Sequence, residues 1–339
     1  MANSWNSRLC CLCIVLVPLV FARPALTKPV YTTLPANTDV ASINDSGVVV
    51  GVMGVPPYSG FIRTPDGVIT TFAAAQNTLG TFPAGINGSG VMTGFYADNA
   101  VVIHGFVRDA GGTITAFDAP GASPNAGGTV PVGINAQGVI TGYYADRSGN
   151  HHGFVRAVDG TITSIDVPGA SQTQAFAIND NGEIVGGWND HVEHGFLRSA
   201  DGTITSFDAP GSSLGTEGDA LNNKGFITGF YVDQNGHAHG YIRRPNGKFT
   251  TVDIGTGGDT YPAAINDRGT IAGRHDNALG AFRAFVRMPS GRVRPISPLN
   301  PNQGDYVSGI NNEGVVAGDF QSRPDQNSPY TDYGYIWTP

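Results

Sequence analysis

The sequence predicts an all-β fold, a seven-bladed β-propeller, from two repeated landmarks and from the way the chain ends. The first landmark is an apolar residue followed by Asn, two variable residues and Gly, and it occurs seven times. Its asparagines are Asn44, Asn87, Asn135, Asn179, Asn222, Asn266 and Asn311, which are spaced 43, 48, 44, 43, 44 and 45 residues apart. Seven copies with a period near 44 residues indicate a repeat architecture.

The second landmark supplies the strands within each repeat. It is typified by "HGFVRDAGGTITAFDAPGAS" from His104 and "HGFLRSADGTITSFDAPGSS" from His194. We expect the first strand to end at the Asn and the second to resemble "GVITGYY" (138–144). "HGFVR" (152–156) typifies the third strand and "GTITSFD" (202–208) the fourth, with Gly, Asn, Asp and Pro in the turns. Four strands in each of seven units predict four-stranded propeller blades.

The two ends of the repeat region predict how the ring closes. The chain stops at "YGYIWTP" (333–339), which matches a third strand, and "VYTTLPAN" (30–37) matches a fourth. The N-terminal strand is therefore expected to complete the last blade and remove an open sheet edge. A β-helix would need shorter repeats, and a helical solenoid would need a 3.6-residue period that is absent.

The N-terminal segment predicts export. Residues 1–22 combine Arg8 with an apolar run too short to span a bilayer, which is typical of a secretory signal peptide. The alternative is a buried N-terminal helix. All three cysteines lie in this segment, so the mature chain is expected to lack disulfides. We expect a linker at 23–29, the propeller at 30–339, a secreted location (extracellular or periplasmic) and no membrane span in the mature chain.

Composition narrows the classes of partner. The net charge is −8 and no Lys/Arg cluster stands out, which argues against nucleic-acid and anionic-membrane binding. The segment "HVEH" (191–194) offers few metal ligands, because His194 belongs to the repeated series. We therefore predict no metal, no cofactor and a monomer that takes an extracellular polysaccharide or a small ligand.

The motifs H-x-F, G-T-I-T, P-G and A-I-N-x-x-G-x-I-V-G together resemble the bacterial extracellular HAF-repeat family. The resemblance covers nearly all of residues 30–339. It implies a secreted or surface-exposed protein, and it implies no single biochemical function.

Four repeats pair a histidine with an aspartate 14 residues later. The pairs are His104 with Asp118, His152 with Asp166, His194 with Asp208, and His239 with Asp253; the other repeats have Ser59 with Ala73, Ala284 with Ser297, and Tyr333 with Pro35. A His–Asp pair can orient a catalytic base. Because an enzyme rarely needs four copies of one dyad, we interpret the pairs as structural hydrogen bonds between the third and fourth strands.

The candidate site lies where the repeat pattern breaks. Five residues before each Asn stand Asp39, Phe82, Val130, Gln174, Glu217, Tyr261 and Tyr306, and eight after stand Val52, Phe95, Tyr143, Gly187, Phe230, Arg274 and Asp319. A four-residue hairpin turn pairs these two rows. Tyr261 would lie beside Arg274, and Tyr306 beside Asp319. With His275 they would converge near the rim of the axial channel, where Glu217 could approach; the alternative is a structural Arg274–Asp319 ion pair.

Three functions remain open from the sequence. The first is binding of an extracellular ligand, expected to be a glycan, on the face of the variable loops, with Tyr306, Asp319, Glu217, Asp39 and Phe82 as ligand-binding residues. The second is a polysaccharide lyase or glycoside hydrolase in which Arg274, His275 and Tyr261 are catalytic. The third is a scaffold for protein–protein interaction.

Overall fold

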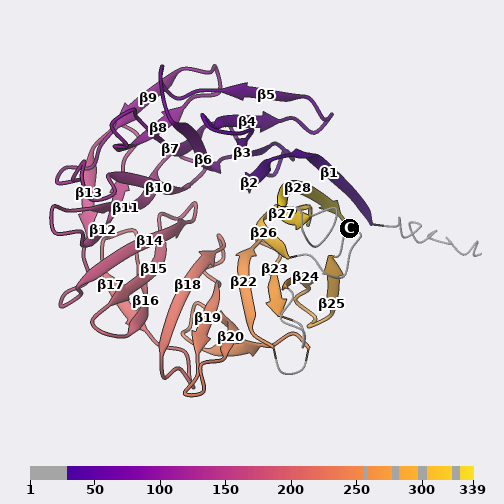
Figure 1. Ribbon diagram of the computed structural model, residues 1–339. Helices are drawn as coiled ribbons and strands as arrows, with labels where there is room; N and C mark the ends of the chain where they lie inside the picture. Colours follow the sequence, from indigo (N-terminus) through magenta and orange to yellow (C-terminus); the bar gives the residue numbers. More distant parts are fainter. Residues whose placement is uncertain (1–28, 256–257, 277–281, 297–303, 323–328) are drawn as a thin grey trace, which may run out of the picture.

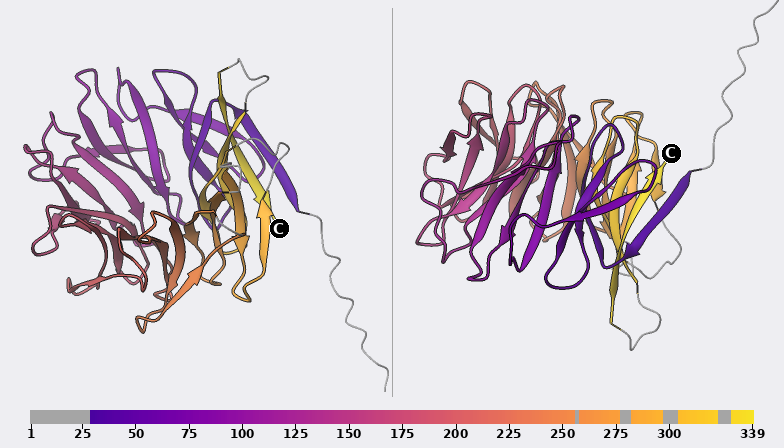
Figure 2. Two further views of the ribbon diagram at one scale, coloured as in Figure 1. Left: turned by 60° about the horizontal axis from the view of Figure 1, so that its bottom comes forward. Right: turned by 90° about the horizontal axis from the view of Figure 1, so that it is seen from above.

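The computed structural model describes residues 29–255, 258–276, 282–296, 304–322 and 329–339, and these contain strands but no helix. The predicted signal peptide and nearly all of the predicted linker lie outside these ranges. Hairpin-linked strands form four-stranded antiparallel sheets that follow one another around a central axis (Figure 1). Seen from the side, the sheets make a thick disc (Figure 2). Among the described residues, no helix is long and apolar enough to cross a membrane.

The described strands number 28 and divide into sheets that we number 1 to 7 in chain order. Sheet 1 holds β2 (Thr38–Ile43), β3 (Val49–Met53), β4 (Ser59–Arg63) and β5 (Ile69–Phe72). Sheet 2 holds β6 (Gly80–Ile86), β7 (Met92–Ala97), β8 (Ile103–Arg108) and β9 (Ile114–Phe117). Sheet 3 holds β10 (Thr129–Ile134), β11 (Ile140–Ala145), β12 (His151–Arg156) and β13 (Ile162–Ile165). Sheet 4 holds β14 (Gln172–Ile178), β15 (Ile184–Asn189), β16 (Glu193–Arg198) and β17 (Ile204–Phe207).

The remaining sheets repeat this pattern. Sheet 5 holds β18 (Gly215–Leu221), β19 (Ile227–Val232), β20 (Ala238–Arg243) and β21 (Phe249–Val252). Sheet 6 holds β22 (Thr260–Ile265), β23 (Ile271–Asp276), β24 (Phe282–Arg287) and β25 (Val293–Ile296). Sheet 7 holds β26 (Asp305–Ile310), β27 (Val316–Ser322), β28 (Thr331–Thr338) and β1 (Val30–Ala36). A single parallel pair, Glu193 with Gly215, also joins sheets 4 and 5.

The two ends of the repeat region meet in sheet 7, as predicted. β1 pairs antiparallel with β28, from Val30 opposite Thr338 to Thr33 opposite Tyr335 (Figure 1). The ring of Tyr31 stacks on Tyr335 at 5.1 Å. The first strand of the fold therefore covers the edge that the last strand would otherwise expose.

The repeated Asn is a buried connector between neighbouring sheets. In Asn266, Oδ1 accepts hydrogen bonds from the backbone N–H groups of Arg268 and Thr270, which holds the hairpin turn. Its Nδ2 donates to the carbonyl of Asn311 in the next sheet at 2.9 Å. The same inter-sheet bond recurs at all seven asparagines, and the last, from Asn311 to the carbonyl of Asn44, joins sheet 7 to sheet 1. This double use of one amide explains why the motif requires Asn.

The apolar core lies between the sheets. One aromatic side chain from each third strand is fully or almost fully buried: Phe61, Phe106, Phe154, Phe196, Tyr241, Phe285 and Tyr335. Clusters around these rings combine residues of neighbouring sheets, such as Val50 of sheet 1 with Met92 and Phe106 of sheet 2. Burial of the aromatic row thus fixes each sheet against the next.

The four His–Asp pairs form as predicted. Nδ1 of each histidine lies 2.6–3.1 Å from its aspartate. Each imidazole also stacks on an aromatic ring of the second strand, at 4.5 Å for His194 on Trp188 and 5.1 Å for the others. The pairs lie at the outer part of four sheets and do not converge on one cavity, which supports the structural interpretation.

The structure corrects one predicted equivalence in this series. His275 of β23 pairs with Arg283, just as Tyr96 of β7 pairs with His104. The histidine position in sheet 6 is therefore Arg283 and not Ala284. Ser297, the predicted partner position, lies outside the described residues.

Candidate functional site

A β-bulge at one place in every innermost strand directs a row of side chains to the axis. The register shifts at the third residue before each Asn, on β2, β6, β10, β14, β18, β22 and β26. The bulged residues are Ala41, Ala84, Val132, Phe176, Asp219, Ala263 and Ser308. A bulge leaves its residue out of the ladder and re-aims the side chain. Four of these residues line a cavity at the axis.

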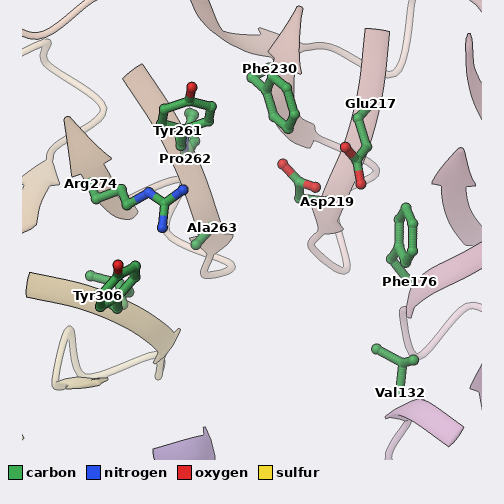
Figure 3. A pocket seen from close by; sticks show the side chains of 11 residues that line it. Val132, Phe176, Glu217, Asp219, Phe230, Tyr261, Pro262, Ala263, Arg274 and Tyr306 are labelled. Atoms are coloured by element: carbon green, nitrogen blue, oxygen red, sulfur yellow. The ribbon is translucent and has the colours of Figure 1, made fainter. Parts of the chain in front are cut away.

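This cavity, the axial pocket, has a volume of about 390 Å³ and opens among the first strands of sheets 3 to 7. Its lining consists of Val132, Phe176, Glu217, Asp219, Phe230, Tyr261, Pro262, Ala263, Arg274, Tyr306 and Val307. Figure 3 shows the carboxyl groups of Glu217 and Asp219 on one wall and the guanidinium of Arg274 on another. Its size falls within the range of small-molecule sites, about 300–1,000 Å³.

Arg274 is held by aromatic rings instead of by a carboxylate. Its guanidinium carbon lies 4.9 Å from the ring centre of Tyr261, 4.8 Å from that of Phe282 and 5.0 Å from that of Tyr306. Its Nε is buried without a hydrogen-bond partner, and within the described ranges no carboxylate lies close enough for an ion pair. The rings hold the cation by cation–π attraction, and its Nε–H finds no acceptor among the described residues.

Two acids of β18 face the same cavity. Glu217 pairs with Phe230 on β19, and Asp219 is the bulged residue two positions later. Burial, followed by the neighbouring carboxylate of Glu193, raises the pKa of Glu217 to about 7. Burial and then Glu217 raise the pKa of Asp219 well above its usual range, although Arg274 opposes the shift. Carboxyl groups whose ionisation is hindered by burial and by a neighbouring carboxylate are a recurring feature of acid–base sites.

The predicted pairing of the two residue rows is confirmed in all seven sheets. In sheet 6 Tyr261 pairs with Arg274, and in sheet 7 Tyr306 pairs with Asp319. Tyr261, Arg274, Tyr306 and Glu217 all line the axial pocket. The structure thus brings together four of the predicted site residues.

His275 and Asp319 do not join them. His275 is on the opposite face of β23, where its Nδ1 donates to the carbonyl of Asp276 and its ring lies 6.3 Å from Phe285. Its row is the one that holds stacked aromatic rings in other sheets. Asp319 accepts a 3.5 Å hydrogen bond from the Ser308 hydroxyl and makes no ion pair with Arg274. The alternative interpretation, a structural Arg274–Asp319 ion pair, is therefore wrong.

Asp39 and Phe82 belong to a separate cavity between sheets 7, 1 and 2. This side pocket of about 330 Å³ is lined by Asn37, Asp39, Val52, Met53, Gly54, Val55, Tyr58, Phe82 and Asp332. Burial, followed by the charge of Asp332, raises the pKa of Asp39. The predicted ligand-binding set is therefore divided between two places.

Sequence reasoning missed Asp219, Phe176 and Phe230. A signal for the bulge was present, since every second strand carries a Gly opposite it. A Cβ atom at Gly229 would lie 2.0 Å from the carbonyl oxygen of Glu217. The equivalent distance is 2.4 Å or less in all seven sheets, which is too short for any residue except Gly. The Gly found at this position in all seven second strands marks where the first strand lies closest to the second. The bulge follows directly, and there the side chain of the first strand turns toward the axis.

Comparison with known proteins supports the fold. Neither a protein-family model nor a curated protein matches the sequence. Among solved structures, virginiamycin B lyase from Staphylococcus aureus superposes with a TM-score of 0.61 and 15% identity, covering 92% of this chain and 99% of that one. A streptogramin B lyase gives 0.59 and 13%, with 91% and 98% covered.

A third match is to part of a longer chain. A prolyl endopeptidase structure gives a TM-score of 0.58 and 10% identity, covering 88% of this chain and 47% of that one. At these identities the likeness shows a shared propeller-like all-β architecture and leaves the chemistry to be argued from the pocket.

Proposed function

We propose that this protein is a closed seven-bladed β-propeller that binds an anionic glycan, recognised through a uronic-acid carboxylate, in the axial pocket. Closure is supported by β1 in sheet 7 and by the Asn311–Asn44 hydrogen bond. Ligand binding is supported above all by one observation: the Arg274 guanidinium lines a cavity and has no acidic partner among the described residues.

An unpaired cation inside a protein is costly, so its retention asks for a reason. Arg274 is fixed by three rings, and no described residue accepts a hydrogen bond from its buried Nε or forms an ion pair with its guanidinium. A carboxylate can accept two parallel hydrogen bonds from such a planar guanidinium. The side chain is thus preorganised for an anionic ligand.

The rest of the pocket fits a ring-shaped ligand that carries this carboxylate. Phe176, Phe230, Tyr261 and Tyr306 give the pocket aromatic walls, against which the apolar faces of sugar rings can pack. Glu217 and Asp219 supply polar groups for sugar hydroxyls on the opposite wall (Figure 3). A broad scaffold surface for protein partners would not need convergent polar groups in a concave site.

Binding can be tested by calorimetry with oligomers of galacturonic, glucuronic and mannuronic acid, with the neutral hexose oligomers as the comparison. We expect binding of at least one uronate oligomer and much weaker binding of its neutral counterpart. Arg274→Ala should weaken binding about 10–100-fold, because a hydrogen bond to a charged group contributes about 1.5–3 kcal/mol.

The matched control is Arg292→Ala, which removes an exposed arginine in the turn between β24 and β25, outside the pocket lining. It should bind as the wild type does. If Arg274→Ala and the wild type bind the uronate oligomers equally well, the assignment of the axial pocket is wrong.

We also propose that the mature protein is secreted and monomeric and that it belongs with the HAF-repeat proteins its motifs resemble. The repeated Asn is buried in every sheet, where it connects neighbouring sheets, and this explains structurally why the repeat motif contains Asn. Fractionation of expressing cells tests the location, and light scattering of the purified protein tests the oligomeric state.

A further inference from the structure

We propose that Glu217 and Asp219 are an acid–base pair that cleaves the bound uronate glycan by β-elimination. This inference rests on the proposed function, because it requires the substrate carboxylate to sit at Arg274. It replaces His275, which lies on the other face of β23, as the predicted proton carrier.

The repeat itself shows that the two acids are not demanded by the fold. Of the seven bulged residues, Asp219 alone is charged; its equivalents are Ala41, Ala84, Val132, Phe176, Ala263 and Ser308. Only sheet 5 has acids both at the bulge and two residues before it. Because buried acids without partners destabilise a fold, their presence together indicates a role at the site.

The geometry places both carboxyl groups against one substrate position. Glu217 and Asp219 flank Gly218 on β18, and the bulge lets both side chains reach the same wall (Figure 3). Among the described residues, neither carboxyl group accepts a hydrogen bond, so both are available to a ligand.

Arg274 completes the arrangement from the facing wall. Its guanidinium and Asp219 influence each other electrostatically, yet they are too far apart for an ion pair. A substrate carboxylate held by Arg274 would therefore lie across the pocket from the two acids. The carbon next to that carboxylate carries the proton that an elimination removes.

The reaction needs one ionised and one protonated group. The ionised member takes the proton from C5 of the uronate, while Arg274 stabilises the negative charge that develops on its carboxylate. The C5–H electron pair forms the C4–C5 double bond, and the C4–O4 bond breaks. The protonated member donates its proton to O4, so that two shorter chains form and no water or oxidant is consumed.

The ionisation of the pair suits this division of labour. Burial and then the charge of Glu193 hold the pKa of Glu217 at about 7. Burial and then the charge of Glu217 hold the pKa of Asp219 well above its usual range, with a smaller contribution from Glu193 and an opposing one from Arg274. Near neutrality the pair therefore holds a proton while its first deprotonation is under way. After turnover the proton can pass between the two carboxyl groups, which restores the starting state.

The test measures cleavage and binding separately with the three uronate oligomers named above. Cleavage is followed by the ultraviolet absorbance of the new C4–C5 double bond conjugated to the carboxylate, and binding by calorimetry. For the wild type we expect unsaturated product, with a rate that rises through about pH 7 as one member of the pair ionises and falls again at higher pH as the other loses its proton. Glu217→Gln and Asp219→Asn should each lose at least about 100-fold in rate but keep binding within a few-fold.

The control Asp201→Asn removes an exposed carboxylate in a surface turn and should cleave at the wild-type rate. Circular dichroism and thermal unfolding show whether each variant is folded. A wild type that binds a uronate oligomer but releases no unsaturated product overturns the acid–base inference and leaves the proposed function standing. Glu217→Gln and Asp219→Asn variants that cleave at the wild-type rate overturn it as well. Failure to bind any of the oligomers overturns the proposed function itself.

Discussion

Asp219 is a residue at which stability and the proposed chemistry make opposite demands. Three sister sheets have alanine at its position, Ala41, Ala84 and Ala263, so the fold accepts a methyl group there. Burial raises the pKa of Asp219, which means that the folded state disfavours its ionised form. The acid is thus kept against the preference of the scaffold.

The first prediction is that Asp219→Ala stabilises the protein near pH 7, by about 1–3 kcal/mol, the usual cost of burying an unpaired polar group. The advantage should shrink as the pH falls toward the ordinary value of 3.8, since both folded and unfolded states then bind the proton. Urea denaturation at pH 7 and pH 4 measures this. A variant less stable than wild type at pH 7 would show that Asp219 has a structural role instead.

Arg274 shows how far residue-level prediction reached. The pairing of Arg274 with Tyr261 across the hairpin could be predicted, because turn length fixes which residues pair in an antiparallel ladder. The ring contacts of Arg274 with Phe282 and Tyr306 could not, since they join three different strands in two sheets. Contacts between side chains of neighbouring sheets cannot be predicted from the repeat spacing. For the same reason the sequence alone did not exclude an ion pair between Arg274 and Asp319.

At the scale of the strand, the faces of β23 explain the error at His275. Side chains alternate along a strand, so His275 and Arg274 cannot face the same cavity unless a bulge separates them. The bulge is on β22, between Pro262 and Ala264, and β23 is regular. The sequence marks the bulge only through the Gly opposite it, and reading that Gly would have directed attention to Asp219.

The second prediction concerns the turn that links neighbouring sheets. Asn266→Ala removes one inter-sheet hydrogen bond and two bonds within the hairpin. It leaves the buried carbonyl of Asn311 without this partner, so we expect a loss of about 2–4 kcal/mol in the free energy of unfolding. Urea denaturation measures the loss, and Asn246→Ala, in an exposed turn, is the control. Equal stability of the two variants would contradict the connector role.

The third prediction concerns the His–Asp pairs that link third and fourth strands. For His152 and His194, burial lowers the pKa, but the hydrogen bonds to Asp166 and Asp208 and the nearby charges outweigh it, so the net shift is upward. A raised histidine pKa adds stability that is full below the ordinary value of 6.5 and is lost as the pH rises through the folded pKa.

Wild-type protein should therefore lose a little stability between pH 6 and 9, roughly 1 kcal/mol for these partly exposed pairs together. A double variant, His152→Gln with His194→Gln, should lack that part of the slope. Parallel urea titrations across this pH range measure the difference. Identical slopes in the two proteins would show that the pairs contribute through packing alone.

At the scale of the whole molecule, the architecture followed from the sequence because a repeat contains its own controls. The period near 44 residues, the four strands per unit and the place of β1 all come from comparing copies. The site is harder to predict, since it lies where copies differ. Glu217 and Asp39 occupy the same position in their repeats, yet Glu217 lines the axial pocket and Asp39 lines the side pocket. Only the three-dimensional arrangement of the sheets shows which of the two belongs to the candidate site.

The last prediction is that β1 holds the molecule together. Its Leu34 is 4% exposed and packs in a core cluster with Val40 and Ile336, and Tyr31 stacks on Tyr335. Removing residues 1–36 would uncover this apolar surface and leave the edge of β28 unpaired, which favours association between chains. We expect a lower unfolding temperature and aggregation on size-exclusion chromatography. Removing only residues 1–28 spares every described strand and should change neither. If the longer truncation behaves in the same way, the molecule does not depend on β1 to stay folded and monodisperse.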